Sequence, residues 1–209
     1  MKKILVLGVL FILPIVAYLF FASGVHSFAK LPIITEKVSE PAETAHTLES
    51  KITILGFMGD TLQNEGSALF NLNQKIYKYF YEFNDFQFLY LIPHGFPEAD
   101  LQKIKKELSG ISNLERWHFV YTDKETIRKT FKSLRTPYRW DPERGSPYVF
   151  IIDKDLNLRG RDEDEHIGTL YGYNSEDIAM ISNKMVDDVK IVLAEYRLAL
   201  KKNNADRKK

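Results

Sequence analysis

Short, almost wholly apolar runs alternate along the chain with longer stretches in which apolar residues recur every three to four positions. Each apolar run has the length of a strand buried on both faces. The runs are residues 52–58, 86–92, 117–121 and 148–152. The stretches between and after them have the spacing of amphipathic helices. They cover residues 64–83, 97–110, 122–134 and 178–200.

Local signals place the ends of these elements. Pro97 opens the second helix and Gly110 ends it. Thr122 or Asp123 caps the third helix, and Asn174 or Ser175 caps the last. Residues 153–157 form the turn of a β-hairpin whose second strand is 158–161, and residues 162–166 form a charged surface loop. This order predicts an α/β fold of thioredoxin-like layout, a three-layer α/β/α sandwich.

The amino terminus predicts a membrane segment. Lys2 and Lys3 precede residues 4–22, a run without charge that Gly8 and Pro14 interrupt. About 20 apolar residues span a bilayer, and flanking lysines favour a cytoplasmic amino terminus. We therefore expect a single transmembrane helix, with the folded domain on the extracytoplasmic, periplasmic side. A cleavable signal peptide is the alternative, because Ser27 and Ala29 form a small-x-small site.

The predicted organisation has four parts. Residues 1–24 are the anchor, 25–50 a linker, 51–201 the folded domain and 202–209 a basic, disordered tail. The linker contains His26 and His46, which we expect to be solvated, and a short strand is expected near residues 31–34.

Composition excludes several classes of function. The chain has no cysteine, so disulfides, thiolate metal sites and cysteine nucleophiles are all excluded. Lysine and arginine number 29 against 28 acids, a formal net charge of +1, so no overall field favours nucleic acid. No GxSxG or HExxH signature of a hydrolase occurs. We expect no enzymatic activity, no cofactor and no nucleic-acid partner.

The chain resembles the SCO/SenC family, membrane-anchored thioredoxin-fold proteins that serve as copper chaperones in cytochrome oxidase assembly. The resemblance rests on the order of four stretches after the anchor. They are LPI at 31–33, ILGFMGDTLQNE at 54–65, WHFVYTDKETI at 117–127 and SPYVFIIDKDLNLRGR at 146–161.

The family's copper ligands are missing. The resemblance places its two cysteines near Thr61 and Glu65 and its histidine near Gly145. Soft sulfur ligands suit Cu(I), whereas a hydroxyl and a carboxylate are hard ligands and glycine has no side chain. Copper delivery by the family's mechanism and thiol–disulfide exchange are therefore not available. The resemblance further implies that the Ser146–Pro147 bond is cis, although local sequence alone favours trans.

Two groups of residues are candidates for a site. The strand ends of this fold bring Asp60, Thr61, Glu65, His94 and Gly145 to one edge, beside Pro147. Oxygen and nitrogen ligands near Asp60 and His94 could hold a zinc or a hard cation. The alternative is that Asp60 or Thr61 caps the helix and His94 lies in a hydrated loop.

The loop before the hairpin combines arginine and aromatic residues, which are enriched in binding hot spots. We expect it to dock a partner protein; the alternative is that its aromatic rings fold back onto the core. The residues are Arg135, Tyr138, Arg139, Trp140 and Arg144, with Pro147 beside them. The main hypothesis is a non-catalytic, membrane-tethered binding or assembly factor, acting in respiratory-complex or envelope assembly. A metal-handling protein is the alternative.

Overall fold

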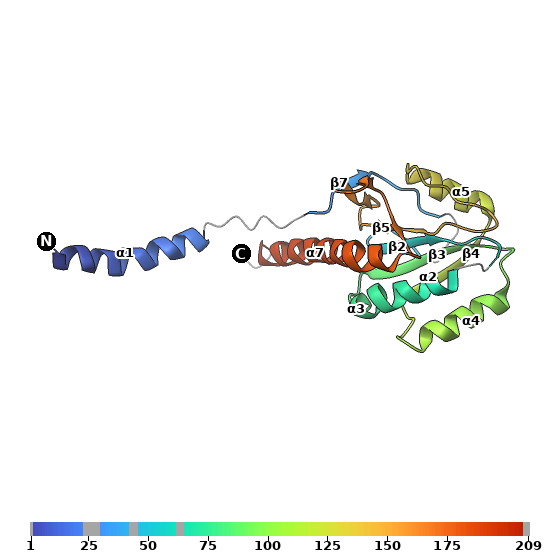
Figure 1. Ribbon diagram of the computed structural model, residues 1–209, viewed down its shortest axis with the longest axis horizontal. Coiled ribbons are helices and arrows are strands. Elements are labelled where there is room, and N and C mark those ends of the chain that lie inside the picture. The colour runs from blue at the N-terminus through green and yellow to red at the C-terminus, as the bar shows by residue number, and fades with distance from the viewer. Residues whose placement is uncertain (1, 23–29, 42–45, 62–64, 207–209) are drawn as a thin grey trace.

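The computed structural model describes residues 2–22, 30–41, 46–61 and 65–206. Helix α1 (Lys2–Ala22) contains Pro14 and is drawn apart from the sheet and its helices (Figure 1). Among the residues described, no helix combines the length and the apolar character needed to cross a bilayer. His26 lies outside the described residues.

The sheet has a mixed topology. Strands β2 (Ile52–Phe57), β3 (Phe86–Pro93) and β4 (Trp117–Thr122) are parallel, with β4 at the end of the sheet, and β5 (Tyr148–Ile152) pairs antiparallel with β2. Beyond β5 come β6 (Leu158–Arg159) and then β1, both antiparallel to their neighbours. β1 is Ile33–Thr35, so the predicted linker supplies an edge strand. The short β9 (Tyr173–Asn174) also pairs with β5.

Helices cover both faces of this sheet. One face is covered by the continuous helix formed by α2 (Glu65–Leu72), the π-helix η1 (Asn73–Tyr77) and α3 (Lys78–Phe80), together with α4 (Glu98–Ser109). The carboxyl-terminal helix packs on the same face; it consists of α6 (Ile178–Met180), the π-helix η2 (Ile181–Met185) and α7 (Val186–Asp206). Helix α5 (Lys124–Ser133) covers the other face, and Figure 1 shows it across the sheet from α2 and α4.

Side chains alternate between two cores, as the two-residue period of a strand requires. In β3, Phe86, Phe88 and Tyr90 join the core under α2 and α4, whereas Leu89 and Leu91 join the core under α5. The α/β fold and the helices on both faces of the sheet agree with the sequence prediction.

Three local predictions were wrong. Residues 162–166 do not form a simple loop, because β7 (Arg161–Asp164) pairs with β8 (Gly168–Leu170), and Asp164 is buried against Lys184. The last helix is capped by Asp177, whose carboxylate accepts hydrogen bonds from the backbone nitrogens of residues 179 and 180. That helix also continues to Asp206, into the predicted basic tail.

Candidate functional site

The turn after β2 is held by the loop that precedes β5. The backbone nitrogens of Asp60 and Thr61 donate to the carbonyl oxygens of residues 142 and 143, both at 3.0 Å. The Thr61 hydroxyl donates to the carbonyl oxygen of Glu143 at 2.9 Å. The backbone nitrogen of Ser146 donates to the carbonyl oxygen of Phe57 at 2.9 Å. Backbone hydrogen bonds therefore join the turn after β2 to the loop before β5.

Gly145 makes this close packing possible. Its φ is +78°, a conformation that side chains rarely adopt. A Cβ at this position would lie 2.7 Å from both the backbone nitrogen of Gly59 and the carbonyl oxygen of Phe57. The position that the resemblance assigns to a copper-binding histidine therefore has no room for a side chain.

The Ser146–Pro147 bond is trans, because the described residues contain no cis peptide bond. The cis expectation taken from the resemblance was wrong. The unusual backbone conformation of this loop lies at Gly145, whose φ is positive. A trans bond before proline is favoured over a cis bond by about 0.5–1 kcal/mol.

Asp60 and His94 do not form a metal site with their neighbours. One carboxylate oxygen of Asp60 is paired with the ammonium group of Lys124, while the other is buried beside Gly95 without a hydrogen-bond partner. The ring of His94 is exposed and parallel to that of Tyr121, with the ring centroids 6.4 Å apart. Within the described parts of the chain, no group of three potential ligands could hold a metal ion. Glu65 begins α2.

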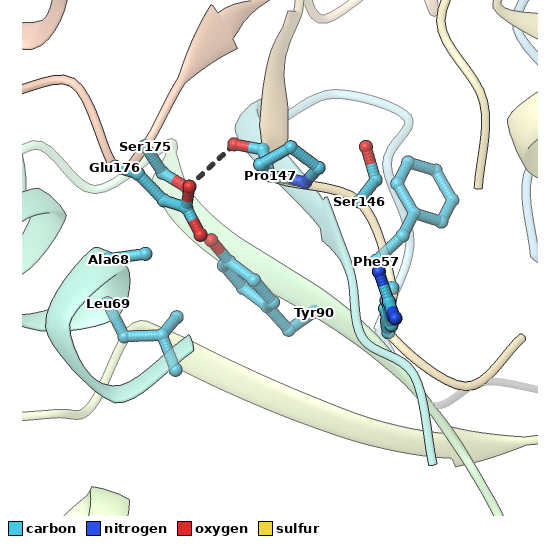
Figure 2. A pocket seen from close by; sticks show the side chains of 10 residues that line it. Phe57, Ala68, Leu69, Tyr90, Ser146, Pro147, Ser175 and Glu176 are labelled. Atoms are coloured by element: carbon cyan, nitrogen blue, oxygen red, sulfur yellow. Dashed lines mark hydrogen bonds between the residues drawn. The ribbon is translucent and has the colours of Figure 1, made fainter. Parts of the chain in front are cut away.

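A cavity of about 220 Å³ opens beside this turn, and we call it the site cavity. Phe57 reaches it from the end of β2 and Tyr90 from within β3, and Ala68 and Leu69 reach it from the middle of α2 (Figure 2). Its remaining lining is Arg144, Gly145, Ser146, Pro147, Ser175 and Glu176. The lining is apolar at its centre, with a cation and an anion from different segments on its border.

Pro147 is exposed, and its carbonyl group is held by Ser175. Its carbonyl oxygen accepts hydrogen bonds from the backbone nitrogen of Ser175 at 2.8 Å and from the Ser175 hydroxyl at 2.7 Å. Figure 2 shows the contact between these two residues, with the carboxylate of Glu176 turned toward the hydroxyl of Tyr90. Sequence patterns did not predict Ser175 and Glu176 as site residues, because it is the pairing of β9 with β5 that brings this distant segment to the cavity.

The aromatic residues of the loop fold back, and their charged neighbours stay exposed. Trp140 is partly buried and donates its indole N–H to the carbonyl oxygen of Met58 at 2.9 Å. The ring of Tyr138 stacks on Tyr148, with centroids 3.7 Å apart. Burial and the nearby tyrosines raise the pKa of Tyr138 to about 12, so its hydroxyl stays protonated at neutral pH. Arg139 is exposed.

The six residues predicted for partner docking fall into three different hollows. Tyr138, Arg139 and Trp140 line one with residues of α5. Arg144 and Pro147 line the site cavity. Arg135, with a φ of +53°, lines a third hollow beside β1. The loop therefore contributes to three separate hollows rather than to a single continuous patch.

These features define a thioredoxin-like α/β domain without the sulfur chemistry of its edge. The chain is structurally similar to BsSco, a member of the Sco family of cytochrome c oxidase assembly proteins. The identity is 14%, the TM-score is 0.52, and the match covers 78% of this chain and 98% of that one. This likeness shows the fold.

Two other similar structures have lower scores. The apo Sco1 protein from Thermus thermophilus is 12% identical with a TM-score of 0.49, over 80% of this chain and 98% of that one. The Arabidopsis thaliana ScoI with copper bound is 15% identical with a TM-score of 0.45, over 78% of this chain and 99% of that one. No protein-family model and no curated protein sequence matches the chain.

Proposed function

We propose that the chain is a non-catalytic binding or assembly factor that holds a partner protein at the edge around Pro147. The proposal rests on one observation. Where the resemblance places sulfur ligands, the turn after β2 and the loop before β5 are in direct backbone contact. Thr61 and Gly145 stand where the resemblance places metal ligands, and both are hydrogen-bonded to or packed on neighbouring backbone. An edge that cannot bind copper or exchange disulfides retains a preformed cavity for a partner.

The proposed partner surface includes the site cavity and the neighbouring loop. Phe57, Tyr90 and Leu69 supply apolar lining, and Arg144 and Glu176 supply charges of both signs on the border. An apolar centre with a polar rim is the usual anatomy of a protein interface. BsSco belongs to a family of cytochrome c oxidase assembly proteins, and by analogy we place the partner in respiratory-complex or envelope assembly.

The proposed location is the extracytoplasmic side of a membrane, with the amino-terminal segment as the anchor. Support comes from the uncharged run at residues 4–22 after two lysines. The large apolar side chains of α1 between Val9 and Leu19 are also 53–72% exposed. Carbonate extraction of membranes tests the anchor, because an anchored chain stays in the pellet. Release of the full chain into the supernatant contradicts the anchor.

Photo-crosslinking in native membranes tests the docking proposal. A benzophenone amino acid in place of Glu176 lies on the border of the site cavity, and the same group in place of Lys106 lies exposed on α4. We expect a discrete crosslinked product from position 176 that position 106 does not give. Equal products from both positions, or stoichiometric copper in the full chain purified in detergent, would overturn the proposal.

A further inference from the structure

A hollow of about 400 Å³ lies between α5 and the loop before β5, and we call it the basic groove. Its lining combines three cationic side chains with aromatic rings and a proline. The residues are Arg128, Phe131, Lys132, Tyr138, Arg139, Trp140 and Pro142. The groove and the site cavity share the same loop, since Trp140 and Pro142 face one and Arg144 to Pro147 the other.

The positive charge of the groove is only partly neutralised. Arg128 pairs with Glu125 at 2.7 Å. Lys132 and Arg139 are exposed, and neither forms an ion pair with any described residue. Arg128 and Lys132 are four residues apart on α5, so they lie on one face of the helix. The groove therefore presents two unpaired cations above an aromatic floor.

Asp141, in the same loop, turns its carboxylate toward the backbone of that loop rather than toward these cations. Asp141 accepts hydrogen bonds through Oδ1 from the backbone nitrogens of Glu143 at 2.8 Å and Arg144 at 3.0 Å. These bonds lower the pKa of Asp141 and direct its carboxylate into its own loop. Among the described residues, Asp141 forms no ion pair with Lys132 or Arg139, so both cations remain open to an anionic ligand.

We infer that the basic groove binds an acidic, proline-containing extended segment of the partner protein. Aromatic-lined grooves accept the preformed polyproline II conformation, in which successive side chains and rings project outward. The acidic side chains of such a segment would face Lys132 and Arg139, and its prolines would contact Tyr138 and Trp140. This inference rests on the proposed docking function and assigns the chemistry of the partner.

Single-stranded nucleic acid suits this groove less well. Base stacking needs free aromatic faces. One face of Tyr138 is already covered by Tyr148, and the Trp140 indole is fixed to the Met58 carbonyl oxygen.

Peptide titration of the full chain in a non-ionic detergent tests the inference. The probe is a fluorescein-labelled (Glu-Pro)5 peptide, compared with (Lys-Pro)5 and (Glu-Gly)5, and binding is followed by fluorescence polarisation. We expect (Glu-Pro)5 to bind, (Glu-Gly)5 to bind several-fold more weakly, and (Lys-Pro)5 not to bind. Raising the salt concentration should weaken binding, because exposed charges are screened. Trp140 emission should respond to unlabelled peptide, and the response should disappear in Trp140→Phe.

Charge reversal locates the binding site. Lys132→Glu with Arg139→Glu should weaken (Glu-Pro)5 binding at least tenfold. The matched control, Lys78→Glu with Lys106→Glu, makes the same change of net charge on exposed residues across the sheet and should stay within twofold. Both double variants should keep the thermal unfolding midpoint of the parent chain.

Four results would overturn the inference. They are no binding of (Glu-Pro)5 up to millimolar concentration, equal binding of the three peptides, equal losses in both double variants, and tighter binding of a ten-nucleotide oligothymidine. Crosslinking at position 176 does not depend on these cations. If this crosslink persists in Lys132→Glu with Arg139→Glu while the peptide titration fails, the inference about the basic groove is rejected. The proposed function would still hold.

Discussion

Gly59 and Gly145 lie back to back across the candidate site. A Cβ on Gly59 would stand 2.4 Å from the backbone nitrogen of Gly145, and a Cβ on Gly145 would stand 2.7 Å from the backbone nitrogen of Gly59. Contacts this short exclude a side chain at either position. The strand–helix turn and the loop before β5 therefore meet backbone to backbone, in the place where the resemblance puts a metal.

Gly59→Ala should destabilise the domain by about 2–4 kcal/mol, because the added methyl group would lie 2.3 Å from the Glu143 carbonyl oxygen and force the loop away. Urea unfolding measures the loss. Gly66→Ala is the matched control, since Gly66 lies in α2 with no atom within 4 Å of its Cβ position. That variant should gain up to about 1 kcal/mol of helix propensity. Equal stability of the two variants would contradict the close contact.

Grafting the family's ligands should not rebuild a copper site. Thr61→Cys with Glu65→Cys provides two thiols, and adding Gly145→His should lower the free energy of unfolding by about 1–3 kcal/mol or more. The reason is the φ of +78° at Gly145 and the lack of room beside Phe57. The comparison is Cu(I) affinity by competition with a chromophoric chelator. Tighter binding by the triple variant than by the double variant would show that the loop opens readily.

Arg159→Met should cost about 3–5 kcal/mol, because it leaves a buried carboxylate unpaired. The Arg159 side chain is 4% exposed, and its guanidinium bonds Asp153 at 3.0 Å, Glu195 at 2.6 Å and the carbonyl oxygen of Leu31 at 2.8 Å. Amide hydrogen exchange should also rise in β1, which this arginine ties to the domain. Arg128→Met, which removes an exposed pair, should cost at most about 1 kcal/mol. Adding Asp153→Asn to Arg159→Met should restore part of the loss.

Stability should fall as the pH drops from about 6.5 to about 4, because His118 resists protonation in the folded state. Burial lowers its pKa to about 4, and the positive charges of His46, Arg116 and Lys51 add to the effect. Its usual pKa is about 6.5, so the unfolded chain binds more protons throughout this interval. Because the site is partly hydrated, we expect a loss of about 1–2 kcal/mol.

Urea unfolding at pH 7, 5.5 and 4.5 checks this dependence by comparing the parent chain with His118→Gln. The variant should lose the part of the slope that the imidazole causes, whereas His94→Gln should keep it, since His94 is exposed. Parallel slopes for the parent chain and His118→Gln would show that other groups dominate the pH dependence of stability.

The ring of His46 stacks on that of His118, with the ring centroids 3.8 Å apart, so the prediction that His46 is a solvated linker residue was wrong.

Short-range patterns along the sequence were enough to predict the strands and helices of the three-layer sandwich. The apolar runs that became β2, β3 and β5 are largely buried under the helical stripes, whereas β4, at the end of the sheet, is only partly buried between Trp117 and Thr122. Such patterns depend only on residues a few positions apart, because a strand repeats every two residues and a helix every 3.6. The absence of cysteine likewise excludes, from the sequence alone, any thiol chemistry at the end of β2.

Tertiary structure alone decided how the edge is closed and what surrounds it. Trp140 bonds to Met58 across 82 positions of the chain, and Ser175 holds Pro147 across 28. The buried Asp164, the trans bond before Pro147 and the basic groove on α5 are likewise outcomes of packing between distant segments. Local sequence does not predict these contacts, because each one depends on which segments the folded sheet brings together.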